Sequence, residues 1–143
     1  MSRWQLVWLH LAVALTTLTG AVFAWMKYFM TSADEFAVAN HPMQPHMLAI
    51  HVVVAPLLLF LLGWTFSNHI VPKYRFGNGK NRRTGIASTA LIVPMALSAY
   101  LLQVATNEAL RTAMTWAHWI SSGLFLLAYL IHLINGRSKS AAA

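Results

Sequence analysis

The stretch that decides the fold is residues 116–136, which read WAHWISSGLFLLAYLIHLING. It is long and apolar enough to cross a membrane as a helix, and it contains two histidines, His118 and His132. At about 100° per helical residue, the spacing between them falls only about 40° short of four full turns, so both imidazoles leave the same helix face. Ionisable residues inside a membrane span are expected to face other helices and to mark a site.

The composition agrees with a membrane protein. Of the 143 residues, 58% are hydrophobic and only 9% are charged. Cysteine is absent, which excludes disulfides, thiolate metal sites, iron–sulfur clusters and covalently attached haem. Only three carboxylates are present, which argues against a carboxylate-pair hydrolase and predicts no catalytic acid–base pair. The seven histidines are therefore the main candidates for chemistry.

The apolar pattern predicts an all-α membrane protein with one four-helix domain covering residues 1–143. We expect helices at about 4–30, 47–69, 85–105 and 113–135, with a basic loop at 73–83 between the second and third. The first segment begins like a signal peptide, but its apolar run is longer than such peptides carry, so we expect it to span the membrane.

The basic residues predict the orientation of these helices. Eight Lys and Arg lie at the N-terminus, in the basic loop and at the C-terminus, whereas only Lys27 and Arg111 lie on the opposite side. The positive-inside rule then predicts an up-down-up-down bundle with both termini in the cytoplasm, in a bacterial inner membrane. The net charge of +7 is explained by this topology, so no nucleic-acid partner is expected.

In this topology the histidines fall at two matched depths. Counted from the outer helix ends, His51 lies four residues in and His118 six, so the two could ligate one iron from opposite sides. Haem is the usual reason for such pairs of histidines. Near the inner surface, His132 and His10 lie at equal depth, and His69 lies two positions deeper. Two candidates therefore compete to be the inner partner of His132.

As the inner partner of His132, His10 is favoured by its depth and by the small residues that follow it, whereas His69 is favoured by helical phase. A stripe of small residues follows His10 and leaves room for a flat macrocycle, although such a stripe is also typical of close helix packing. The spacing from His51 to His69 is about 27 Å, which exceeds the separation of the two histidines on the fourth helix by roughly 6 Å. However, this spacing makes five full turns, which places His69 on the face of His51. The stripe consists of Ala14, Thr17, Ala21 and Ala24.

Polar residues at the membrane surfaces are candidates for quinone and proton handling. At the cytoplasmic end these are His69, Lys73, Tyr74 and Arg75, of which Lys73 and Arg75 are possible contacts for a quinone or a haem propionate. At the outer end they are Asp34, Glu35, His41 and Glu108. His41 and His46 lie in or beside the outer loop, where we expect solvated or capping roles.

One histidine on the first helix, one early on the second and the same-face pair His118 and His132 on the fourth resemble the bacterial cytochrome b561 family. The cytochrome b membrane subunits of formate dehydrogenase and nickel–iron hydrogenase have a similar arrangement. The resemblance covers the four-helix core and rests on spacing and topology. It implies two b-type haems, held by His51 with His118 outside and by His10 with His132 inside. The additional His69 departs from the pattern and leaves the inner ligand open.

The resemblance also implies a function, namely a dihaem subunit that passes electrons between the quinone pool and a partner redox subunit of a respiratory complex. A free-standing b561-type oxidase, taking electrons from an external donor such as superoxide to quinone, is the alternative within this class. A haem-free assembly or transport subunit is the alternative from another class, with histidines serving metal passage or helix packing. The expected partners are membrane lipid, quinone or quinol, and a redox subunit.

Overall fold

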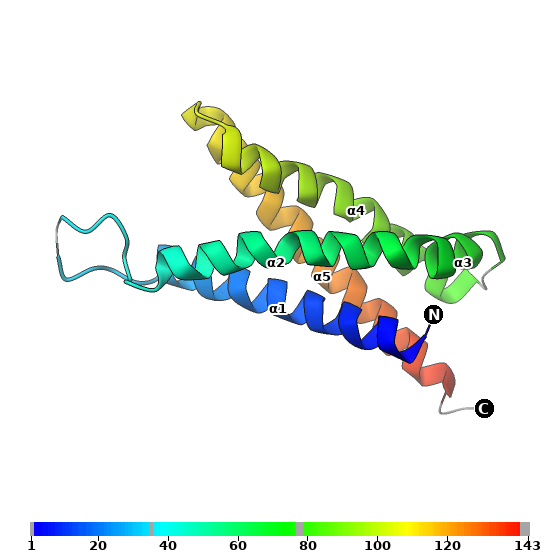
Figure 1. Cartoon of the computed structure of the whole chain (residues 1–143). Coiled ribbons are helices and arrows are strands. Elements are labelled where there is room, and N and C mark those ends of the chain that lie inside the picture. The colour runs from blue at the N-terminus through cyan, green and yellow to red at the C-terminus, as the bar shows by residue number, and fades with distance from the viewer. Residues whose placement is uncertain (1, 35, 77–78, 141–143) are drawn as a thin grey trace. The chain divides into compact units, whose positions relative to one another are not determined.

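The computed structural model describes residues 2–34, 36–76 and 79–140, and all regular structure in them is helical. Four helical segments are long and apolar enough to cross a membrane: Arg3–Tyr28, Gln44–Phe76, Asn81–Val104 and Glu108–Gly136. The prediction of an all-α membrane protein is therefore confirmed. The elements, shown in Figure 1, are α1 (Arg3–Tyr28), α2 (Gln44–Thr65), η1 (Phe66–Ile70), α3 (Val71–Phe76), α4 (Gly79–Val104) and α5 (Glu108–Ser140).

Local sequence explains where the helices begin. Ser2 and Gln5 form a reciprocal capping box at the start of α1, in which each side chain accepts a hydrogen bond from the other residue's backbone N–H. At the start of α5, the side chain of Asn107 accepts a hydrogen bond from the backbone N–H of Leu110 at 3.0 Å. A proline occupies the first turn of α2, where its missing N–H costs no helical hydrogen bond.

The chain divides into two compact units, Met1–Val71 and Pro72–Ala143. In the first unit α1 packs against α2, and in the second α4 packs against α5 (Figure 1). Each of these pairs is a helical hairpin. The prediction of one four-helix domain requires the two hairpins to assemble, and it stays a prediction.

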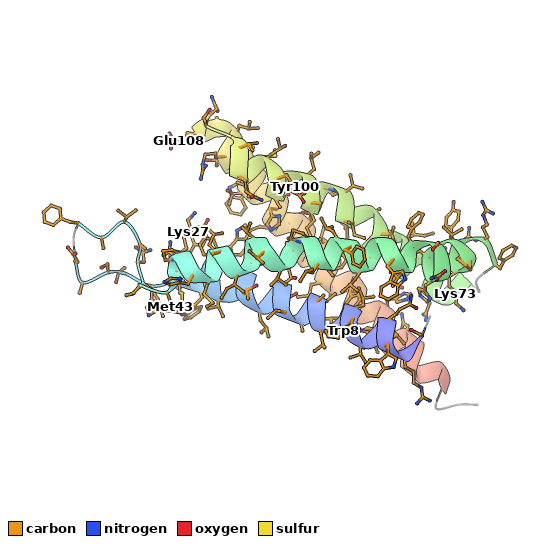
Figure 2. The ribbon with its side chains drawn as sticks, viewed as in Figure 1. Trp8, Lys27, Met43, Lys73, Tyr100 and Glu108 are labelled. Atoms are coloured by element: carbon orange, nitrogen blue, oxygen red, sulfur yellow. The ribbon has the colours of Figure 1, made fainter. Side chains whose placement is uncertain are left out.

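The surfaces of both hairpins are strongly apolar. Large apolar side chains project from all four long helices, as Figure 2 shows for Trp8 and Tyr100, each 54% exposed. In water such continuous apolar surfaces would be unfavourable, whereas in a bilayer they contact lipid tails. The buried apolar side chains are few: Leu9, Ala12, Val13, Val54, Leu58, Ala105 and Phe125.

The predicted basic loop at 73–83 is wrong, because most of it is helical. Lys73 and Arg75 lie in α3, and α4 already begins at Gly79, so only residues 77–78 separate the two helices, outside the described residues. The guanidinium of Arg82 lies 4.9 Å from the ring centroid of Tyr74, a contact that joins α3 to α4. Lys and Arg are good helix formers, so polarity alone was a poor indicator of a loop.

The second predicted helix, 47–69, begins earlier and is interrupted near its end. It starts at Gln44, and from Phe66 to Ile70 the backbone forms a π-helix that contains His69. A π-helical turn contains more residues than an α-helical turn, so it changes the direction of the side chains that follow by about one residue's rotation, roughly 100°. The phase argument that placed His69 on the His51 face assumed an uninterrupted α-helix and no longer applies.

Candidate functional site

In the first unit His51, on α2, is held against α1. Its Nδ1 lies 3.0 Å from the backbone carbonyl oxygen of Thr16 and 3.3 Å from the hydroxyl oxygen of Thr19. The ring lies so close to Gly20 that a Cβ added there would approach His51 Cε1 to 2.8 Å. Only glycine fits at this position without moving the imidazole.

His118, near the start of α5, is held in the same way from α4. Its Nδ1 lies 3.0 Å from the carbonyl oxygen of Met95 and 3.4 Å from the hydroxyl oxygen of Ser98. As at His51, Nδ1 faces a backbone carbonyl oxygen and the hydroxyl of the residue three positions later.

His132, further along α5, also contacts α4. Its Nδ1 lies 3.1 Å from the hydroxyl oxygen of Thr84. A Cβ added at Gly85 would lie 3.4 Å from His132 Cε1 and 3.6 Å from Nδ1, so this glycine too lies against an imidazole. We call each of these three arrangements a histidine seat. The seats are Thr16, Thr19 and Gly20 for His51; Met95 and Ser98 for His118; and Thr84 and Gly85 for His132.

The two seats of α4 match the two histidines of α5 in spacing. The separation of Thr84 from Ser98 along the chain equals that of His118 from His132, and the pairs run in opposite directions. α4 and α5 are therefore antiparallel, and a single alignment of these two helices places both histidines of α5 against their seats on α4. Phe125, midway between the two histidines in sequence, is buried on the same face. The prediction that both histidines share one face is confirmed, and this face lies against α4.

His10 lies on α1 and is half-buried. Thr16, whose carbonyl oxygen faces His51 of α2, is offset by about 120° on the helix from His10, whereas the buried Val13 is offset from His10 by only about 60°. Two members of that stripe, Ala14 and Ala21, are exposed. Ala14 and Ala21 are therefore not buried by the packing of α1 against α2.

The observed helix bounds change the comparison of depths. Counted from Gln44, His69 lies one position further along its helical segment than His132 lies along α5 counted from Glu108. His10, counted back from Tyr28 at the end of α1, falls short of the depth of His132 by six positions. Depth therefore no longer favours His10, just as the π-helix removes the phase argument for His69.

The other polar candidates lie at the ends of the helices. His69 lies in η1, near the end of the first unit, and Lys73 and Arg75 are exposed in α3, which begins the second. Figure 2 shows Lys73 and Glu108 at opposite ends of the second unit. Near the loop of the first unit, His41 accepts a hydrogen bond at Nδ1 from a backbone N–H two residues on, at 3.1 Å. His46 and Asp34 are exposed, and Glu35 lies outside the described residues.

The seated histidines provide donor atoms of the kind that haem iron takes. Among the described residues, no group of three or more His, Asp or Glu side chains could hold a metal ion. Haem iron needs only two protein ligands, and a ligating histidine characteristically has its other nitrogen bonded to a carbonyl or another acceptor. Two buried side-chain oxygens have no hydrogen-bond partner among the described residues: Thr16 Oγ1, in the seat of His51, and Oδ1 of Asn81, whose carbonyl accepts from Thr84. Such atoms are rare, and a group that binds beside them is one explanation.

Sequence reasoning found the histidines but missed the residues that hold them. α4 contains no histidine and was given no functional residue, yet it provides the seats of His118 and His132. The signal was present as a hydroxyl residue followed by a small residue, at Thr84–Gly85 and again at Ser98–Ala99. Alone, such pairs are too common in membrane helices to be recognised as functional.

The fold and the site together define a multi-pass helical membrane protein in which three histidines lie at helix–helix contacts. Comparison of the chain with family models, with curated proteins and with solved structures finds no match.

Proposed function

We propose that the protein is a dihaem b-type cytochrome subunit that transfers electrons between the quinone pool and a partner redox subunit of a respiratory complex. The proposed ligands are His51 with His118 for the outer haem and His10 with His132 for the inner haem, with His69 as the alternative to His10. Each pair takes one histidine from each hairpin. In this proposal the protein lies in a bacterial cytoplasmic membrane as an up-down-up-down bundle with both termini in the cytoplasm.

The observation that carries the proposal is the common anchoring of three histidines through Nδ1. In His51, His118 and His132 this nitrogen lies within hydrogen-bond distance of oxygen atoms on the neighbouring helix. The nitrogen that would ligate iron is therefore Nε2 in all three. Helix packing alone places no such requirement on which ring nitrogen makes the bond.

Bis-histidine haems would supply one-electron transfer, because both axial positions are filled. The chain's own residues would supply the proton chemistry, since quinone turnover moves two protons with two electrons. His69 is suited to this task because an imidazole titrates near neutral pH. The cationic side chains of Lys73 and Arg75 follow it in sequence and would stabilise negative charge on a bound quinone.

Pyridine haemochrome analysis of the purified full-length protein tests the cofactor count. We expect two non-covalent b haems per chain and a reduced-minus-oxidised spectrum of the b type. A value near zero would favour the haem-free assembly or transport subunit instead. Rapid reduction by superoxide without any partner subunit would favour the free-standing oxidase.

Single substitutions test the ligands. His118→Ala should remove the outer haem and His132→Ala the inner one, each leaving about one haem per chain with its spectrum largely intact. The reason is that removal of one axial ligand leaves only one of two coordinate bonds to the protein. Two haems retained in either variant would show that the pairing on α5 is wrong.

A further inference from the structure

Three hydroxyl groups in the seats share one hydrogen-bond pattern. The hydroxyls of Thr19, Thr84 and Ser98 each donate to the carbonyl oxygen three residues earlier, at 3.1, 3.1 and 3.0 Å. Thr19 and Ser98 can alternatively donate to the carbonyl four residues earlier, at 2.8 and 2.7 Å. A hydroxyl has a single proton, so an oxygen that donates to the backbone can only accept from the histidine that it faces.

This pattern bears on which ring nitrogen of each histidine is protonated. Where the seat hydroxyl donates to the backbone, it accepts from the histidine, and Nδ1 then carries the hydrogen. For His51 and His118 the conclusion is reinforced by a backbone carbonyl 3.0 Å from Nδ1, since a carbonyl cannot donate. In the neutral imidazole the lone pair then lies on Nε2.

The three seats also share a sequence pattern. Each hydroxyl residue is followed by a small residue, in the pairs Thr19–Gly20, Thr84–Gly85 and Ser98–Ala99. At Gly20 the imidazole lies so close that an added Cβ would approach Cε1 to 2.8 Å, whereas at Gly85 the corresponding distance of 3.4 Å is ordinary van der Waals contact. Gly20 thus admits the His51 ring, and in each seat a hydroxyl residue faces the histidine.

We infer that Thr19, Thr84 and Ser98 are positioning residues that set the Nδ1–H tautomer of His51, His132 and His118 before any cofactor binds, presenting Nε2 as the ligating atom. The inference rests on the proposed function only where it names haem iron as the group that Nε2 ligates. The tautomer itself is a property of the haem-free protein.

His41 provides an internal contrast within the same chain. Its Nδ1 accepts a hydrogen bond from the backbone N–H of Met43 at 3.1 Å, so its proton must lie on Nε2 when the ring is neutral. Free imidazole side chains in water also favour the Nε2–H form. The seats therefore select the less common tautomer, which makes their effect measurable.

The experiment is ¹⁵N ring spectroscopy of the full-length protein, labelled at histidine, prepared without haem and reconstituted in lipid bilayers above neutral pH. Signals are assigned from single histidine substitutions. We expect protonated Nδ1 at His51, His118 and His132, and protonated Nε2 at His41. An Nε2–H tautomer at the three seated histidines in this preparation would overturn the inference.

Thr84→Val tests the hydroxyl directly, because valine keeps the shape and removes the acceptor. We expect the His132 signals to shift toward the Nε2–H form, and haem retention at this site to weaken by about tenfold to a hundredfold, the usual effect of losing such a partner. Thr84→Ser should restore both. Thr89→Val is the matched control, since the Thr89 hydroxyl donates to a carbonyl of the same helix at 2.8 Å. We expect it to leave the His132 tautomer unchanged.

The outcomes separate this inference from the proposed function. An unchanged His132 tautomer in Thr84→Val, with normal folding, would overturn the positioning role even if two haems bind. Conversely, an absence of haem from the purified protein would overturn the proposed function, while the ring spectra of the haem-free protein would still decide the tautomer.

Discussion

At the scale of single residues, the position of the His51 imidazole depends on the space that Gly20 leaves beside it. Gly20 and Gly63 lie in the same hairpin and differ sharply in this respect. A Cβ at Gly20 would approach His51 Cε1 to 2.8 Å, whereas a Cβ at Gly63 would meet nothing within 4 Å. Glycine is therefore required at position 20 because the His51 ring lies against it, whereas no neighbouring atom requires glycine at position 63.

Gly20→Ala should therefore displace the His51 ring from Thr16 and lower the occupancy of the outer haem by about tenfold or more. Gly63→Ala should leave both haems in place, and its better helix propensity, about 1 kcal/mol, should leave thermal stability equal or higher. Haem content and the spectra of the two purified variants check this pair. Equal haem content in both variants would contradict the close fit at Gly20.

At the scale of elements, the helices were largely predictable because apolar runs of membrane length are a strong signal. The π-helix at Phe66–Ile70 was not, since no apolar periodicity distinguishes a π-helical turn within an otherwise continuous helix. The seat residues of α4 were also missed, because their role depends on which helix α4 packs against. Sequence thus predicted the histidines of the candidate site but not the atoms that orient them.

The π-helix makes His69 the residue whose role most needs a test, and π-helical turns are frequent at functional sites. His69→Gln should keep both haem spectra and slow quinone-linked electron transfer several-fold, with a changed pH dependence, because the glutamine cannot titrate. His10→Ala should instead lose the inner haem. Stopped-flow reduction by a quinol analogue, together with haem content, checks both variants. Loss of haem with His69 and its retention without His10 would assign the inner ligand to His69.

At the scale of the whole molecule, the uneven distribution of charge predicts the orientation in the membrane. Eight basic residues at the predicted inner side against two at the outer side give a strong topological bias. In the second unit, Lys73 and Glu108 lie at opposite ends (Figure 2).

Reporter fusions test this orientation. Green fluorescent protein fused to the C-terminus should fluoresce, and alkaline phosphatase inserted after Asn107, between α4 and α5, should be active. A phosphatase fused at the C-terminus should be inactive, because the enzyme requires export. An active C-terminal phosphatase would invert the topology and exchange the inner and outer haem assignments.

The seats lie between helices that are consecutive along the chain, and this has a consequence for biosynthesis. The bonds of His51 to α1, and of His118 and His132 to α4, join residues 32, 20 and 48 positions apart. Each imidazole can therefore find its partner while a single hairpin leaves the ribosome and enters the bilayer. The hydrogen bonds within the hairpin offset the free-energy cost of moving a polar ring into hydrocarbon, and they form without the other hairpin.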